Sequence, residues 1–143
     1  MFQFIVLMYH NFSDNRQNKY TLDFKTFINQ LDKLLVDGFV IEGFDGLLKR
    51  IKSGEWPERY VLITFDDGHR SNLIAAEILS NKGASGTFFI TKDYPTNQGD
   101  YLNEDEILEL SKIAQIGSHS ISHSNMKKLE LNRLNFELAN SKL

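Results

Sequence analysis

The sequence predicts an α/β fold built on a parallel sheet, and three observations indicate it. Short apolar runs without period-two alternation recur along the chain, which is typical of strands that are covered on both faces. A segment with the apolar spacing of a helix follows each run. A glycine closes three of these segments (Gly38, Gly54 and Gly83), and glycine at this place favours a left-handed cap. Five strand and helix units in succession therefore favour parallel strands joined by right-handed crossovers.

Each expected element rests on a local pattern. Strands are expected over residues 4–9, 39–41, 60–65, 87–90 and 114–116. Helices are expected over 24–35, 44–51, 71–82, 103–112 and 128–143, and the first two repeat apolar residues at the i, i+3, i+4 and i+7 spacing. Asn103 and Glu106 together resemble a capping box, and no stop signal precedes the end of the last helix. Either an open doubly wound sheet or part of a barrel fits this order, and in both the ligand site lies at the carboxyl ends of the strands.

The composition narrows the class of protein. The 143 residues form one expected domain, and 16 Lys and Arg against 19 Asp and Glu give a net charge of −3, which disfavours nucleic acid as a partner. Cysteine is absent, which excludes disulfides, thiolate metal sites and cysteine nucleophiles, so any metal must use histidine and carboxylate ligands. The longest apolar run near the start, residues 4–9, is far shorter than the roughly 18 residues of a membrane span. Because no basic stretch precedes it, no signal peptide is expected in these residues. Either the chain is cytoplasmic or its targeting segment is missing.

An acidic pair, Asp66 and Asp67, follows the third expected strand directly and precedes Gly68. A tight turn explains Asp-Gly without any chemistry. However, the segment that follows has helical spacing, so two carboxylates stand together where a strand gives way to a helix. Placing like charges side by side raises the free energy unless a cation or an unusual protonation state compensates.

The four histidines also follow expected strands. His119 and His123 come after the last strand, and a spacing of four residues allows both imidazoles to face one ion, although a solvated Ser and His loop is the alternative. Together with one of the two aspartates they make a three-ligand set with open coordination positions, as in catalytic zinc sites. The other aspartate is then free to accept a proton from water. The residues therefore predict metal-assisted hydrolysis.

These motifs resemble the first two motifs of the polysaccharide deacetylases, the NodB-like carbohydrate esterases. The residues that carry the resemblance are Thr64-Phe65-Asp66-Asp67-Gly68, His119-Ser120-Ile121-Ser122-His123, Gly86-Thr87-Phe88-Phe89-Ile90 and Leu7-Met8-Tyr9-His10. The resemblance implies a distorted or partial (β/α) barrel and removal of N-acetyl groups from an N-acetylglucosamine-containing polysaccharide. It also implies Asp66 as the catalytic base and Asp67, His119 and His123 as ligands of a divalent ion, zinc first, with cobalt or another ion as alternatives. Members of the family are often extracellular or in the cell envelope.

The sequence also departs from this family. The family continues with an Arg-x-Pro-Tyr-like motif that helps to hold the oxyanion and with a later histidine that protonates the leaving amine, and neither occurs in these 143 residues. We therefore expect a deacetylase domain over residues 1–143 that lacks its C-terminal third. Losing an oxyanion donor costs about 3–4 kcal/mol of transition-state stabilisation, and losing the general acid about 10²–10⁴-fold in rate, so impaired activity is expected. Exposed sheet edges predict a homo-oligomer or a swapped assembly.

Two further histidines and two other functions complete the expectations. His10 and His69 are interpreted as lining the pocket, with partly exposed loop histidines as the alternative. A metal- or glycan-binding module derived from a deacetylase, which binds but does not turn over, is the second candidate function. An open-sheet protein whose Asp and His loops have no joint function is the third, and it predicts no affinity for divalent ions.

Overall fold

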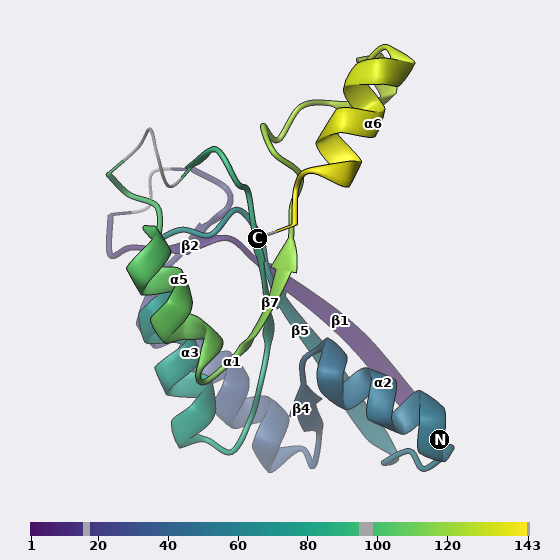
Figure 1. Ribbon diagram of the computed structural model, residues 1–143. Helices are drawn as coiled ribbons and strands as arrows, with labels where there is room; N and C mark the ends of the chain where they lie inside the picture. Colours follow the sequence, from purple (N-terminus) through teal and green to yellow (C-terminus); the bar gives the residue numbers. More distant parts are fainter. Residues whose placement is uncertain (16–17, 95–98, 143) are drawn as a thin grey trace.

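The computed structural model describes residues 1–15, 18–94 and 99–142 (Figure 1). The main sheet consists of β1 (Gln3–Tyr9), β4 (Val40–Glu42), β5 (Arg59–Phe65), β6 (Thr87–Ile90) and β7 (Gln115–Ser118). The short strands β2 (Asn11–Phe12) and β3 (Thr21–Leu22) pair separately. The helices are α1 (Phe24–Val36), α2 (Phe44–Ser53), α3 (Asn72–Asn81), α5 (Glu104–Ser111) and α6 (Leu131–Ala139), with a 3₁₀ turn at Met126–Lys128. The predicted α/β class is confirmed. Among the described residues, no helix is long and apolar enough to span a membrane.

β5 is the centre of the sheet, and every pairing in the sheet is parallel. β1 pairs with β5 along all of its length, from Gln3 opposite Arg59 to Tyr9 opposite Phe65. On its other edge β5 pairs first with β4 and then with β6, and β6 pairs with β7. Since all strands run in the same direction, their carboxyl ends meet at one edge. β1 and β7 are the outer strands of the described sheet.

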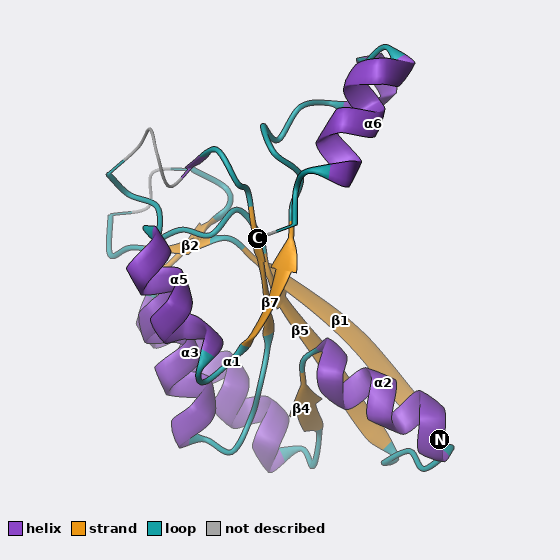
Figure 2. Cartoon of the chain, viewed as in Figure 1, coloured by secondary structure: helices purple, strands orange, loops and turns teal. Residues whose placement is uncertain are grey.

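The core forms between the sheet and three helices. Figure 2 shows α1, α3 and α5 together on one side of the strands, with α2 away from them and α6 clear of the sheet. β5 is buried from Tyr60 to Phe65, and Phe65 stacks on Phe88 of β6 with ring centroids 4.2 Å apart. Phe27 of α1 and Leu79 of α3 pack into the same core. Burial of these apolar side chains is the main stabilising term of the fold, and it holds the strand ends that carry the site.

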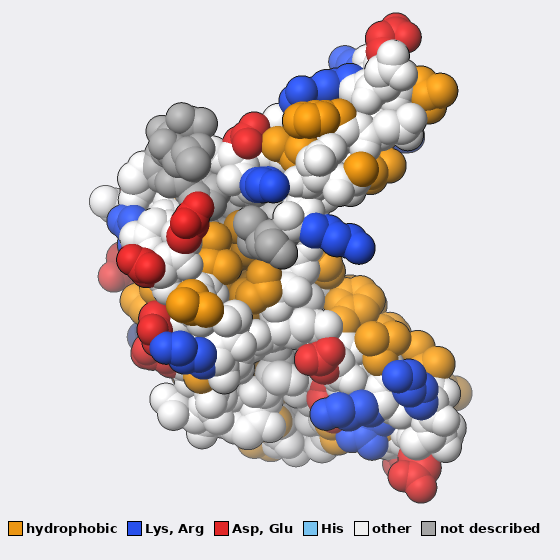
Figure 3. All heavy atoms as spheres, in the orientation of Figure 1, with side chains coloured by type: hydrophobic (Ala, Val, Ile, Leu, Met, Phe, Trp, Pro, Cys, Tyr) orange, Lys and Arg blue, Asp and Glu red, His pale blue; other side chains and the backbone are white. Residues whose placement is uncertain are grey.

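The expectation that every strand is covered on both faces is wrong for β1. Phe4, Val6 and Met8 are 42%, 56% and 57% exposed, and they alternate with residues that pack against the core. The reason is that no described helix covers this face of β1. Figure 3 shows hydrophobic side chains along the wall of the recess between α6 and α2. The open edges of β1 and β7 agree with an oligomer, which stays a prediction.

Helix ends follow the sequence signals except in the last helix. Gly38, Gly54 and Gly83 have φ angles of 80°, 74° and 67°, and the capping box formed by Asn103 and Glu106 is present. The prediction of one helix over 128–143 is wrong, because α6 is confined to Leu131–Ala139, and residue 143 lies outside the described part. Past Ala139, the side chains of the next two residues donate hydrogen bonds to the carbonyl oxygens of residues 136 and 138. Polar side chains that take helix carbonyls in this way compete with continuation of the helix.

Candidate metal centre

The strand ends bring the candidate residues together. Asp66 and Asp67 directly follow β5, and His119 directly follows β7. The backbone bonding of the sheet extends into these loops, because the Asp66 N–H donates to the Tyr9 carbonyl at 2.9 Å and the His119 N–H donates to the Ile90 carbonyl at 2.9 Å. The sheet therefore fixes the backbone at the start of both loops that carry the candidate residues.

Asp67, His119 and His123 form one compact group of potential ligands. The Nε2 atoms of His119 and His123 lie 3.5 Å and 3.3 Å from Oδ1 of Asp67, and the three ligand atoms lie within 4.8 Å of one another. A tetrahedral ion with bonds of about 2.0–2.2 Å separates its ligand atoms by roughly 3.3–3.6 Å. In addition, Oδ1 of Asp67 is buried and accepts no hydrogen bond. A buried carboxylate oxygen without a partner is costly, so the group fits a divalent cation.

The backbone at these residues is strained. Among the described residues, Asp67, Ser120 and His123 are the non-glycine residues with positive φ, at 74°, 69° and 55°. Such conformations raise the free energy of a non-glycine residue and gather at functional sites. Gly68 has φ of 80°, and a Cβ atom there would lie 2.9 Å from Cδ1 of Ile90. Local preference thus disfavours the backbone of Ser120 and His123, whereas Asp67 and Gly68 form a pair that adopts positive φ more readily.

Asp66 is half-buried beside this group without belonging to it. Burial raises the pKa of its carboxyl group, electrostatic interaction with His119, His10 and His123 opposes this rise, and the negative charge of Asp67 adds to it. The two aspartates thus differ in the structure, since Asp67 is in the ligand group and Asp66 is beside it, and their separate chemical roles stay a prediction.

His10 and His69 line a small cavity of about 110 Å³ that also has Asp67 and Tyr101 in its wall. Nδ1 of His69 accepts a hydrogen bond from the Ser71 N–H at 3.1 Å, and burial lowers the pKa of His69. The backbone of His10 is held by the buried Asn72 side chain, whose Nδ2 donates to the His10 carbonyl at 2.8 Å. Both histidines are thus fixed by residues at the start of α3.

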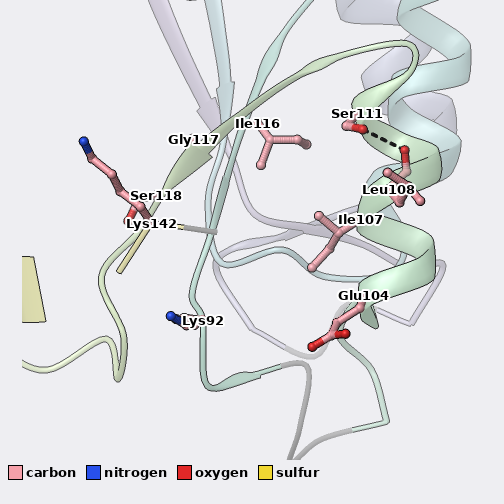
Figure 4. Close-up of a pocket in the computed structure, with 9 residues that line it drawn as sticks. All are labelled: Lys92, Glu104, Ile107, Leu108, Ser111, Ile116, Gly117, Ser118 and Lys142. Carbon is pink, nitrogen blue, oxygen red and sulfur yellow. Dashed lines mark hydrogen bonds between the residues drawn. The ribbon is translucent and has the colours of Figure 1, made fainter. Parts of the chain in front are cut away.

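Two larger cavities differ in chemistry. One of about 510 Å³ has His119 and His123 in its wall, so the ligand group is open to ligands on this side as well. The other, of about 760 Å³, lies between α5 and β7 and has a mainly apolar wall that includes Ile107, Leu108 and Ile116 (Figure 4). Its described lining contains neither aspartate nor histidine. This 760 Å³ cavity is therefore separate from the candidate ligand group.

Several supporting residues were missed by sequence analysis. Ser71 and Asn72 look like ordinary residues of a helix start, and Tyr101 follows a loop without a motif. Glu137 is fully buried in α6 and accepts hydrogen bonds from the loop that carries the two imidazoles. No pattern in the sequence distinguishes Glu137 from the exposed charged residues around it, because its partners are 15 and 16 positions away.

The fold and the site together define an α/β domain, built on a parallel sheet, with a potential Asp-His-His metal centre at the strand ends. The family model described as polysaccharide deacetylase matches residues 53–143, which is 91 of the 143 residues (143 − 53 + 1). The chain belongs to the polysaccharide deacetylase family. Among curated proteins, none matches it significantly.

Solved structures with the same fold include proteins described as deacetylases. The Streptococcus pyogenes deacetylase PplD, solved in complex with acetate, superposes with a TM-score of 0.83 at 19% identity over 96% of this chain and 65% of that one. IcaB from Ammonifex degensii gives 0.82 at 20% identity over 99% of this chain and 67% of that one. BC0361, a polysaccharide deacetylase from Bacillus cereus, gives 0.77 at 24% identity, covering 98% and 45%. The chain thus has their fold and spans two thirds of their length or less.

Proposed function

We propose that this chain hydrolyses N-acetyl groups of an N-acetylglucosamine-containing polysaccharide in a metal-dependent reaction. The observation that carries the proposal is the buried Oδ1 of Asp67, which has no hydrogen bond and faces the Nε2 atoms of His119 and His123 at 3.5 Å and 3.3 Å. These three residues would hold the ion. Membership of the deacetylase family supports the reaction class.

The donor set favours zinc, with cobalt as a close substitute. Two imidazoles and one carboxylate are ligands that zinc accepts, and three protein ligands leave coordination positions for water and substrate. When bound there, the ion supplies Lewis-acid polarisation of the acetyl carbonyl and lowers the pKa of water. Asp67 contributes the negative charge of the set, and the two imidazoles must be unprotonated at Nε2 to serve as ligands.

Asp66 is assigned as the general base. Its carboxylate accepts a proton from the attacking water, whose oxygen forms a bond to the acetyl carbonyl carbon. The bond between that carbon and the sugar nitrogen then breaks, the leaving nitrogen takes up the proton that Asp66 had accepted, and the products are acetate and a free amine. Its position beside the ligand group, within the influence of His10, His119 and His123, supports this role.

The surroundings of the group suit a sugar. The ring centroids of Tyr94 and Tyr101 lie 4.5 Å apart, and those of Tyr94 and His123 lie 6.0 Å apart. Aromatic rings with a hydroxyl tip offer a flat apolar face together with hydrogen-bonding capacity. The 110 Å³ cavity beside Asp67 is much smaller than the roughly 300 Å³ of a typical ligand pocket, so it suits a group of acetyl size. The saccharide would lie across the open rim.

A metal- or glycan-binding module without turnover is the second candidate. The observation that favours it is coverage, because this chain spans only 65% of PplD and 45% of BC0361. Groups that complete catalysis in a longer chain could lie in the part that is not spanned. This candidate keeps the ion and the glycan contacts but releases no acetate.

Acetate release from N-acetylglucosamine oligomers with added Zn²⁺ or Co²⁺, measured beside calorimetric titration of the metal, separates the candidates. Asp67→Asn is compared with Asp105→Asn, which makes the same change on the exposed face of α5. Release that Asp67→Asn abolishes and Asp105→Asn preserves supports the hydrolase. Metal binding without release supports the module. If neither ion binds the parent chain, both candidates are wrong.

A further inference from the structure

α6 is attached to the rest of the molecule in an unusual way. The helix stands clear of the sheet (Figure 1), and none of its residues belongs to the described hydrophobic core. The one buried side chain of the helix is Glu137, which is 0% exposed. A helix normally docks through an apolar face, whereas α6 docks through a carboxylate.

The carboxylate of Glu137 is fully occupied. Oε2 accepts hydrogen bonds from the backbone N–H groups of Ile121 at 2.9 Å and Ser122 at 3.0 Å. Oε1 accepts from the Ser122 hydroxyl at 2.6 Å and from Nη2 of Arg133 at 2.8 Å. A buried charge is costly unless it is paired and hydrogen-bonded. Three of its four partners are groups of the loop between His119 and His123.

This loop is held from two sides. On the β6 side, the Lys92 N–H donates to the Ser120 carbonyl at 3.1 Å, and the Asp93 N–H donates to the Ile121 carbonyl at 2.9 Å. On the opposite side, Glu137 takes the N–H groups of the loop. The bound amides lie between Ser120 and His123, the two loop residues with positive φ.

We propose that Glu137 is a positioning residue that fixes the loop in its strained conformation and so sets the two imidazoles toward Asp67. This inference rests on the proposed metal site. A strained turn persists only when its surroundings over-determine it, and amide bonds to a buried carboxylate supply that constraint. Groups behind a metal ligand that orient it typically change metal affinity or activity by 10–100-fold when they are removed. Glu137 acts in this way through the loop backbone, without contact to the ion.

The alternative is that Glu137 only anchors α6. Loss of an anchor would free the helix and leave metal affinity unchanged, because the core contains no residue of α6. The two roles therefore differ in the Zn²⁺ affinity, whereas the hydrogen exchange of the Ile121 and Ser122 amides in the metal-free protein reports whether the loop bonds to Glu137 have been lost.

The test compares three variants with the parent chain. Glu137→Ala removes all acceptors, Glu137→Gln keeps one acceptor oxygen for the two amides, and Arg133→Gln removes the ion pair while leaving the loop bonds intact. Zn²⁺ affinity is measured by calorimetry, amide exchange by NMR, and the integrity of the sheet by circular dichroism. Asp67→Asn reports whether the parent binds zinc at the proposed site.

We expect Glu137→Ala to weaken Zn²⁺ binding by about 10–100-fold and to expose both amides to exchange. Glu137→Gln should recover part of both, and Arg133→Gln should match the parent. Parent-like Zn²⁺ affinity in Glu137→Ala, with or without faster exchange of the two amides, would overturn the positioning role while leaving the metal site standing. If the parent does not bind zinc, or if Asp67→Asn leaves its zinc binding unchanged, the proposed function is overturned and this inference with it.

Discussion

Substituting the two adjacent aspartates separately should divide binding from catalysis. Asp67→Asn replaces the buried, unpartnered oxygen that faces both imidazoles with an uncharged amide group. Removing a group that only orients a metal ligand typically lowers metal affinity by 10–100-fold. Because Asp67 is assigned as a direct ligand, Asp67→Asn should lower the zinc affinity by at least about 100-fold. Asp66→Asn leaves all three ligand atoms in place, so most of the zinc affinity should remain.

The two substitutions should lower acetate release for different reasons. Removing a general base typically lowers the rate by 10²–10⁴-fold, which is about 2.7–5.4 kcal/mol in the barrier. Asp66→Asn should therefore lose acetate release at saturating zinc, whereas Asp67→Asn should lose it together with the metal. Calorimetry and acetate release on the same preparations provide both values. Loss of zinc affinity in Asp66→Asn equal to that in Asp67→Asn would refute this division of roles.

Three further predictions concern stability and association. Burial alone would raise the pKa of Glu137, but hydrogen bonds from Ser122 and Ile121 and the charge of Arg133 hold it below its ordinary value of 4.5. The ionised Glu137 therefore stabilises the folded state fully above about pH 4.5, and this contribution is lost as the pH falls further. Urea unfolding between pH 3 and 7 should show the loss on the acid side, and the loss should be smaller in Glu137→Gln. Gly68→Ala should destabilise the fold by about 1–2 kcal/mol because of its left-handed backbone, and an unchanged unfolding midpoint would contradict the strain argument. The open sheet edges predict concentration-dependent association in light scattering, and a strictly monomeric chain at every concentration would exclude it.

The fold class was predictable because its signals are local. Glycines at Gly38, Gly54 and Gly83 and the capping box at Asn103 mark helix ends through backbone conformation, and the structure has each of them. The convergence of Asp67 with the two imidazoles was also accessible, since parallel strands bring their carboxyl ends to one edge of a sheet.

Other features depend on contacts that no local pattern encodes. The sequence of β1 gives no sign that one of its faces lacks a helix, because the apolar run 4–9 looks the same whether one face or two are covered. Glu137 occupies an ordinary position in a charged helix, and its role arises only when the loop after β7 lies against it. The end of α6 was misplaced because side chains after Ala139 take the helix carbonyls.

Anomalous diffraction at the zinc edge, from crystals grown with Zn²⁺, tests the central claim most directly. The account predicts one strong peak per chain at about 2.0–2.2 Å from Oδ1 of Asp67 and from Nε2 of His119 and His123. A peak bound by other residues, or no peak beside these three atoms at saturating zinc, would contradict it.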